Sequence, residues 1–339
     1  MPVRPSTTTA LTATLTTAAL TAALIAVPVA ALSASAGEMK FANYMASTHP
    51  YVEACFQPFA DRIAEATAGA ATVKLYNGGE LGAGPAEQYG RVVDGVAEFA
   101  VSLPGYTASN FPLTLLAELP GVTDAATGTA TIWNNIALFA PEYRRAHLVA
   151  LWSSAPNILF TRTKPVRSPA DMAGMKVRVP SRNAGLQVEA WGGSPVSMPV
   201  SEIYNALQTG VIDAAMIDAT AVGAFKLGEV ATYITTGMDS TNSPFFILMN
   251  RDAYADQDDA AKAVINAAGR VASLDCNKVQ LDVAAAGLQQ FAAMPGKEVI
   301  ALTPDQARAF DDLSAQVTMQ IVAETGDGAQ EIVDALKVR

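Results

Sequence analysis

An arginine lies inside an otherwise apolar strand pattern at residues 175–179. Arg178 stands between Val177 and Val179, and Pro180 ends the run. A guanidinium stays protonated at any ordinary pH, so an arginine beside a hydrophobic core needs an anion to face. That anion is either a carboxylate of the protein itself, in a structural ion pair, or the carboxylate of a ligand. The spacing of the residues supports both possibilities equally.

Other side chains that suit a ligand contact stand at strand ends, in loops or along strands. Ligands on a parallel sheet bind beyond the carboxyl ends of the strands, in pockets that are largely apolar with few polar groups. The candidate contacts besides the arginine are the polar residues Asn43, Glu80, Gln88, Ser102 and Asp218 and the aromatic residues Trp152 and Phe245. For Asp218, capping of the following helix is an equally good explanation. We expect the neighbouring Phe246 to face the core, since adjacent strand residues point to opposite sides.

The chain lacks the patterns typical of catalysis, metal binding or cofactor binding. The GxSxG pattern of serine hydrolases is absent, and His147 begins a strand without obvious triad partners. Two cysteines and two histidines, all far apart in sequence, are a poor set of metal ligands. The glycine-rich loop at 77–82 lacks both common phosphate-binding patterns, so we interpret it as a tight connection. We therefore expect no enzyme activity, no metal and no cofactor.

The composition is that of a globular protein with a large core. The chain has 339 residues, of which 50% are hydrophobic and 16% charged, and this predicts two lobes rather than one. The formal net charge is −10, and the sequence contains no basic cluster. An acidic protein of this kind is a poor nucleic-acid binder.

Residues 1–36 have the features of a signal peptide. Arg4 is followed by a Thr/Ala/Leu stretch, an apolar segment at 18–32 and the small residues Ala-Ser-Ala at 34–36. We expect cleavage after Ala36 and export to the periplasm. An uncleaved membrane anchor is the alternative, but the apolar segment is short and rich in Ala and Thr. Cleavage would change the net charge from −10 to −11, because it removes Arg4.

The two cysteines, Cys55 and Cys276, allow two interpretations. In an oxidising compartment they could form a disulfide that closes a very long loop. Alternatively they are two separate buried thiols, since cysteine is among the most buried residue types. The Cα separation decides the question, and a sequence does not provide it. We expect free thiols.

Strand and helix patterns alternate along the chain. The first half predicts strands at 39–45, 71–76 and 98–102 with helices between them, which is a βαβαβ unit with a parallel sheet. Residues 160–220 repeat this alternation and predict a second sheet. Together the two units predict an α/β protein with two similar lobes.

Two later segments would connect the lobes. An apolar strand at 243–250 would cross back between them, and a helical pattern at 260–294, roughly 50 Å long, would brace both. We place lobe I at 37–157, with 244–284 returning to it, and lobe II at 158–243, with 285–339 returning to it.

Several stretches of the chain together resemble a known family. The runs DMAGMKVRVP and SPVSMPVSEIYNALQTGVID, within residues 171–213, resemble the DctP-type substrate-binding proteins of TRAP (tripartite ATP-independent periplasmic) transporters. The segments FANYMASTHP, NGGELG, FPLTLLAELP and RSPADMAG resemble further parts of that family, in the same order.

The resemblance implies a periplasmic-binding-protein-like fold of two lobes, each a mainly parallel sheet flanked by helices. Such a protein closes on a small organic acid and delivers it to the small and large subunits of a membrane permease. The resemblance also implies that the arginine of the KxRVP strand, Arg178 here, pairs with the carboxylate of the ligand. We expect the protein to act as a monomer.

Two positions depart from the family pattern. Many members have a DGQENP-like run with an asparagine that often contacts the ligand, where this chain has Ile217. Some members, notably sialic-acid binders, have a second arginine where this chain has Ile158. The two isoleucines favour a smaller or more apolar monocarboxylate over a sugar acid or a dicarboxylate. The alternatives are an ABC-type or sensory periplasmic binding protein, or a secreted α/β hydrolase.

Overall fold

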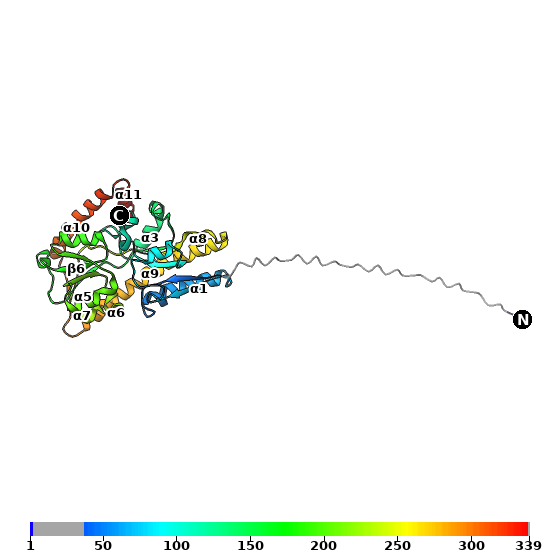
Figure 1. The fold of residues 1–339 in the computed structure, drawn as a ribbon, viewed down its shortest axis with the longest axis horizontal. Coiled ribbons are helices and arrows are strands. Elements are labelled where there is room, and N and C mark those ends of the chain that lie inside the picture. Colours follow the sequence, from blue (N-terminus) through cyan, green and yellow to red (C-terminus); the bar gives the residue numbers. More distant parts are fainter. Residues whose placement is uncertain (3–36, 338–339) are drawn as a thin grey trace. The chain divides into compact units, whose positions relative to one another are not determined.

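The computed structural model describes residues 1–2 and 37–337. The cleavage site predicted after Ala36, and all but the first two residues of the predicted signal peptide, lie outside the described residues. Within 37–337 the chain folds into two mixed sheets flanked by helices (Figure 1). In this described part, no helix combines the length and the apolar character needed to cross a bilayer.

The first sheet has five strands in the order β2–β1–β3–β10–β4. They are β1 (Gly37–Ala42), β2 (Ala71–Tyr76), β3 (Phe99–Ser102), β4 (Ala146–Trp152) and β10 (Phe245–Asn250). β1 pairs in parallel with β2 and β3, which confirms the predicted βαβαβ unit. β10 runs antiparallel between β3 and β4. The apolar strand predicted to cross back from the second sheet therefore becomes part of the core of the first.

The second sheet has six strands in the order β11–β9–β5–β8–β6–β7. They are β5 (Ile158–Thr161), β6 (Lys176–Val179), β7 (Ser194–Ser197), β8 (Ala214–Ile217), β9 (Tyr233–Thr236) and β11 (Glu298–Ala301). β6 is parallel to β7 and β8, and β9 is parallel to β11, whereas β5 is antiparallel to both of its neighbours. The strand that carries Arg178 is thus flanked by two parallel strands.

Helices cover both faces of each sheet. The α-helices are α1 (Gln57–Ala66), α2 (Gln88–Val93), α3 (Gly128–Asn134), α4 (Arg182–Ala190), α5 (Ile203–Thr209), α6 (Ala221–Ala224), α7 (Leu227–Val230), α8 (Arg251–Ala255), α9 (Asp259–Ala293), α10 (Pro304–Thr325) and α11 (Ala329–Leu336). Alternate strand residues belong to different hydrophobic clusters. In β10, Phe245 and Ile247 pack on the side of α1 and α9, while Phe246 and Leu248 pack on the opposite side. Phe246 faces the core, as the strand alternation predicts.

Helix α9 spans both sheets. It has 35 residues, which at 1.5 Å per residue is roughly 52 Å. It packs on α1 and β4 of the first sheet and on α6 and β11 of the second (Figure 1). Two glycines permit this close packing. A Cβ at Gly269 would overlap the carbonyl oxygen of Val149 in β4, and one at Gly287 would overlap that of Ala219, just after β8.

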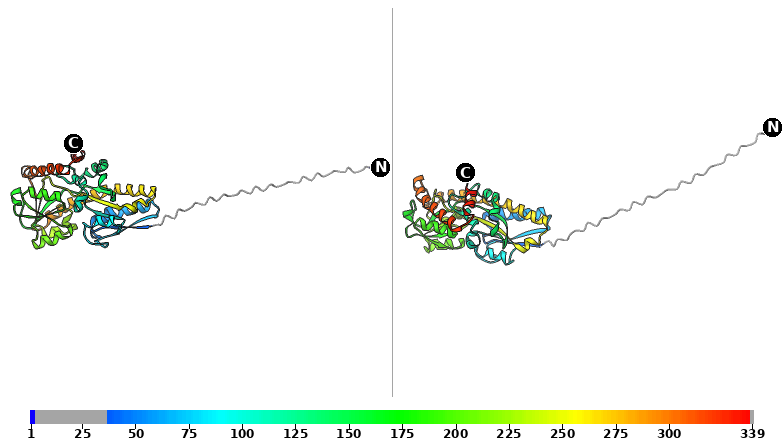
Figure 2. Two further views of the ribbon diagram at one scale, coloured as in Figure 1. Left: turned by 45° about the horizontal axis from the view of Figure 1, so that its top comes forward. Right: turned by 90° about the horizontal axis from the view of Figure 1, so that it is seen from above.

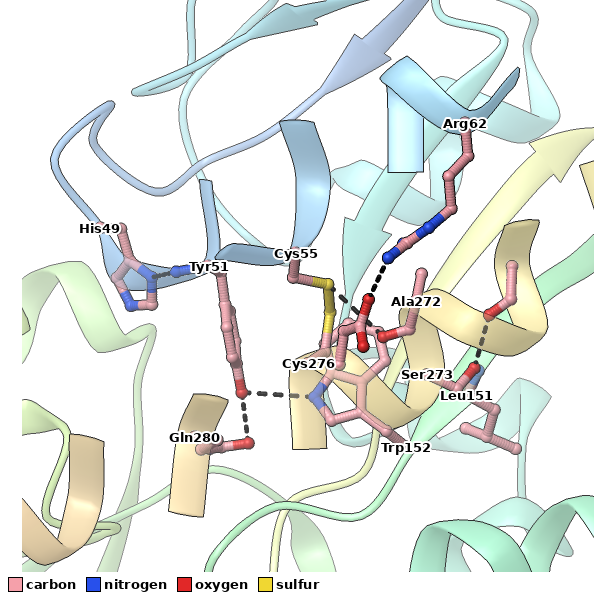
Figure 3. The surroundings of a disulfide bond; sticks show 12 residues. His49, Tyr51, Cys55, Arg62, Leu151, Trp152, Ala272, Ser273, Cys276 and Gln280 are labelled. Atoms are coloured by element: carbon pink, nitrogen blue, oxygen red, sulfur yellow. Dashed lines mark hydrogen bonds and ion pairs between the residues drawn. A yellow bond between two sulfur atoms is a disulfide. The ribbon is translucent and has the colours of Figure 1, made fainter. Parts of the chain in front are cut away.

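Cys55 and Cys276 form a disulfide, so the expectation of two free thiols is wrong. Their Cα atoms are 5.2 Å apart, within the range that a disulfide requires. The bond joins the π-helical turn Val52–Phe56, which precedes α1, to the middle of α9 (Figure 3). The two residues are 221 positions apart, and they meet because both segments pack on the same face of the first sheet. Closing so long a loop removes much conformational entropy from the unfolded chain.

The C-terminal segment contacts both sheets. Phe310 of α10 packs in a cluster of the second sheet, whereas Ile332 and Leu336 of α11 pack in a cluster of the first. Figures 1 and 2 show the red C-terminal helix beside α3. The lobe boundaries stay predictions. The prediction places residues 285–339 with the second lobe, but α11 packs against the first sheet. The reason is that its apolar face is buried against the first sheet.

Candidate functional site

A cavity lies between loops of the two sheets. The space between its lining atoms is about 450 Å³, including the part open to solvent. Its lining residues are Tyr44, Met45, His49, Tyr51, Leu103, Tyr106, Arg178, Pro180, Val200, Ile217, Asp218, Thr220, Phe225, Ser243, Phe245 and Gln280. Most of them follow the carboxyl ends of β1, β3, β6, β7 or β8, which is where α/β sheets bind ligands.

Arg178 lies at this cavity and is only 1% exposed. Its Nε donates to the carbonyl oxygen of Met198 (3.0 Å), and its Nη1 donates to that of Met216 (3.2 Å). Its Nη2 donates to the hydroxyl of Tyr106 (3.2 Å). Since a guanidinium has five N–H donors, one N–H on each terminal nitrogen is left over. Two such donors are what a carboxylate needs for a two-point contact.

Arg178 has no ion-pair partner among residues 37–337. None of the ion pairs in this part of the chain includes it. Burial lowers the pKa of its guanidinium, yet an arginine side chain stays charged in proteins. A buried charge without a counter-ion is costly. Among the described residues, no ion pair therefore accounts for the buried charge of Arg178.

Tyr106 reaches Arg178 from the first sheet. It belongs to the 3₁₀ segment Pro104–Asn110, which follows β3. Its hydroxyl accepts from Arg178 Nη2 and from the backbone N–H of Val200 (3.3 Å). Two N–H donors from the second sheet and its following segment, on Arg178 and Val200, thus point to the same hydroxyl oxygen of Tyr106. A ligand carboxylate oxygen suits the same kind of donor pair.

Three of the predicted ligand contacts line the cavity, namely Arg178, Asp218 and Phe245. Asp218 does not cap the following helix, since Thr220 is the N-cap of α6 and no side-chain cap bond is present there, and its contact with a ligand stays a prediction. Its Oδ1 accepts from the backbone N–H of Thr220 (2.9 Å) at the start of α6, and its Oδ2 accepts from Gln280 Nε2 (3.0 Å). Asp218 therefore shapes the turn and is also present at the cavity.

Trp152 lies behind the cavity wall. Its side chain is fully buried and its ring stacks on Phe245, with 5.3 Å between the centroids. Its indole Nε1 donates to the hydroxyl of Tyr51 (3.3 Å), as Figure 3 shows. Trp152 does not line the cavity but supports Phe245 and Tyr51, which do, and its contact with the ligand stays a prediction.

The other four predicted contacts do not line the cavity. Asn43 donates to Asn77 Oδ1 (2.9 Å) and so braces the loop after β1. The side chains of Gln88 and Ser102 donate to backbone carbonyls of the glycine-rich connection. Glu80 is exposed. These four residues therefore lie outside the cavity wall, and their contact with a ligand stays a prediction.

Several cavity residues are absent from the predicted contacts. Tyr106 lies in the segment after β3, so the strand-end argument that selected Ser102 could also have selected it. Gln280 comes from α9, and nothing in a helical pattern distinguishes it from its neighbours. His49 faces the cavity rather than serving only as a turn residue, and burial lowers its pKa to about 4.

A buried carboxyl group connects segments of the two sheets near this site. Glu118 is 2% exposed and accepts from the hydroxyl of Ser181 (2.8 Å). Glu118 ends the 3₁₀ segment Thr114–Glu118, which packs on the first sheet, whereas Ser181 caps α4 of the second. Burial raises the pKa of Glu118 from its usual 4.5 to about 8. Between these values the native protein holds a proton that the unfolded chain has released.

The raised pKa of Glu118 predicts a loss of stability as the pH rises. The contribution is fully present below about pH 4.5 and is lost by about pH 8. We expect Glu118→Gln, which stays neutral at every pH, to melt progressively higher than the unmodified protein as the pH rises through this range. Melting curves between pH 5 and 9 measure this difference, with the exposed Glu202→Gln as the control. Parallel curves for the Glu118→Gln and unmodified proteins would contradict the prediction.

Comparison with known proteins identifies the family. Residues 41–325 match the model of DctP, the bacterial extracellular solute-binding proteins of family 7. A solute-binding protein of Albidiferax ferrireducens is 26% identical over 284 residues, which cover 81% of this chain and 82% of the relative. The ectoine-binding periplasmic protein TeaA of Halomonas elongata is 24% identical over 277 residues, 78% of this chain and 80% of the relative.

The fold has close counterparts among solved structures. A TRAP solute-binding protein of Rhodoferax ferrireducens, in complex with copurified benzoate, superposes with a TM-score of 0.83 at 24% identity. The superposition covers 89% of this chain and 96% of the other. The two-sheet architecture and the matched span of residues 41–325 agree with the resemblance that the KxRVP strand suggests. The chain belongs to the DctP family and is a substrate-binding protein of a TRAP transporter.

Proposed function

We propose that this protein captures a small monocarboxylate in the cavity at Arg178. The carrying observation is the buried guanidinium, which has two unused N–H donors and no ion-pair partner among residues 37–337. In a cavity that excludes water, a carboxylate on this fork gains both affinity and a defined orientation.

The apolar residues near the arginine support a monocarboxylate over a sugar acid. Ile217 lines the cavity where the family often has an asparagine. Ile158 is its cross-strand partner on β5 and packs in the same hydrophobic cluster. Proteins of the same fold have been solved with mandelate and with D-glucuronate, so the fold alone does not select the ligand. The apolar wall beside Arg178 favours acids that are smaller or less polar than uronates.

Contacts between the two sheets support capture by closure of the cleft. Tyr106 and Glu118 of the first sheet side bond to Arg178 and Ser181 of the second. A ligand that touches both sides would select the closed arrangement. The closed protein would then deliver its ligand, in the periplasm, to the small and large permease subunits of the transporter.

A thermal-shift screen over organic acids tests this function. A ligand that binds only the folded protein stabilises it by about 2.7 kcal/mol at a concentration of 100 Kd. We expect monocarboxylates to raise the melting temperature more than uronates or dicarboxylates do, with Kd then measured by calorimetry. Tighter binding of glucuronate or succinate than of any simple monocarboxylate without a sugar ring would contradict the assignment, and so would binding of uncharged solutes alone.

A further inference from the structure

Asp218 is a second buried ionisable group at the cavity, and burial raises the pKa of its carboxyl group. It directly follows β8 and is 5% exposed. No lysine, arginine or histidine of residues 37–337 forms an ion pair with it. Its two oxygens accept one hydrogen bond each, from Thr220 N–H and Gln280 Nε2. A carboxylate has about four acceptor positions, so acceptor capacity remains.

A directional chain of hydrogen bonds ends at Asp218. The indole of Trp152 can only donate, so the hydroxyl oxygen of Tyr51 accepts from it and its proton points to Gln280 Oε1. The amide NH₂ of Gln280 then points to Asp218 Oδ2 (3.0 Å). Figure 3 shows the first part of this chain, from Trp152 through Tyr51 to Gln280. The network holds the carboxylate in place as an acceptor.

The titratable groups that face this region offer no cation to Asp218. His49 accepts from the backbone N–H of Tyr51 at its Nδ1 (3.2 Å), and burial lowers its pKa to about 4, so it is neutral at pH 7. Burial raises the pKa values of Tyr44 and Tyr51, so both stay protonated. Arg178 is the remaining charged group that lines the cavity, and it forms no ion pair with Asp218.

The charge balance of the cavity constrains the ligand. With Asp218 ionised and no ligand bound, the cavity holds one cation, Arg178, and one anion, Asp218. An acid that carries only its carboxylate would leave one uncompensated negative charge among largely buried side chains, and this is costly. A solute with both a carboxylate and a cationic nitrogen would leave none. The aromatic side chains of Phe225 and Phe245 also line the cavity and suit an organic cation.

We propose that Asp218 forms a second subsite that binds a cationic nitrogen, so that the solute is a zwitterionic monocarboxylate. Its carboxylate binds Arg178, and its protonated amine or amidine binds Asp218. This inference rests on the proposed function, because Arg178 must hold the carboxylate end.

Matched pairs of acids test the subsite. Pipecolate and cyclohexanecarboxylate differ in whether the ring carries an ammonium group, as do proline and cyclopentanecarboxylate. We expect the zwitterions of these pairs, or ectoine, to bind at least about 10-fold more tightly than the acids without a cation, as measured by calorimetry at pH 7. Asp218→Asn should weaken binding of the zwitterion at least about 30-fold and leave that of the simple acid unchanged or improved. Asp305→Asn, at an exposed carboxylate, is the matched control, and melting curves check that each variant folds.

The outcomes separate this inference from the proposed function. If the simple acids bind as tightly as their zwitterionic partners and Asp218→Asn changes neither, the subsite is wrong while the role of Arg178 stands. If none of these acids binds, both proposals fail. A second measurement uses the unmodified protein and does not depend on the Asp218→Asn variant. Calorimetry in two buffers should show proton uptake when a simple acid binds, because Asp218 must then take up a proton, and none when a zwitterion binds.

Discussion

Arg178→Ala is expected to remove nearly all affinity for the carboxylate ligand. Truncating one partner of a buried, hydrogen-bonded charge pair costs about 2–5 kcal/mol, which corresponds to a loss of roughly 30-fold to several thousand-fold in Kd. The loss should appear with every acid that the unmodified protein binds, because the guanidinium is the common anchor. Calorimetry with the acid that gives the largest thermal shift measures it.

Two further variants show that the loss belongs to the guanidinium. Removing Arg178 also frees the carbonyl oxygens of Met198 and Met216, so a lower melting temperature is expected. Arg178→Lys keeps the charge but not the planar fork, and its affinity should fall between the other two proteins. Arg182→Ala, which removes an exposed arginine paired with Glu324 (2.8 Å), is the control and should bind normally. A folded Arg178→Ala protein with unchanged affinity would place the ligand elsewhere.

Arg178 was predictable from sequence because its environment is local. A charged residue among valines, followed by a proline, is visible in five consecutive residues, and the parallel strands on both sides then bury it. The same holds for the alternation of strands and helices up to residue 220, which follows from the hydrophobic periodicity of each segment, whereas β9 and β11 were not predicted.

The rest of the site was not predictable because long-range packing creates it. The Cys55–Cys276 bond and the contact of Tyr51 with Gln280 both depend on where α9 crosses the first sheet. No pattern within either segment indicates its partner. Asn43 and Ser102 are the reverse case, because we proposed them as ligand contacts and they lie outside the cavity wall. They stand at strand ends, where ligands bind, but their side chains satisfy local hydrogen-bonding groups instead.

Gly269→Ala and Gly287→Ala are each expected to destabilise the protein, although alanine is the better helix former. In the helical pattern both glycines look like interruptions, but the structure places them where α9 touches the two sheets. A Cβ at Gly269 would lie 2.7 Å from the carbonyl carbon of Val149 and overlap its oxygen. One at Gly287 would lie 3.2 Å from the carbonyl carbon of Ala219 and overlap its oxygen. Neither backbone can yield without moving α9 away from a sheet.

The cost of that movement should exceed the gain in helix propensity. Overpacking a well-packed site costs about 1–3 kcal/mol or more, whereas replacing glycine by alanine in a helix otherwise stabilises by about 1 kcal/mol. Gly90→Ala in α2 separates the two effects, since a Cβ there meets nothing within 4 Å. We expect this control to melt at the same temperature or slightly higher, and both α9 variants to melt several degrees lower. Because Ala219 adjoins Asp218, Gly287→Ala should also weaken ligand binding. An α9 variant as stable as the unmodified protein would contradict the prediction and show that the helix is not held this closely to the sheets.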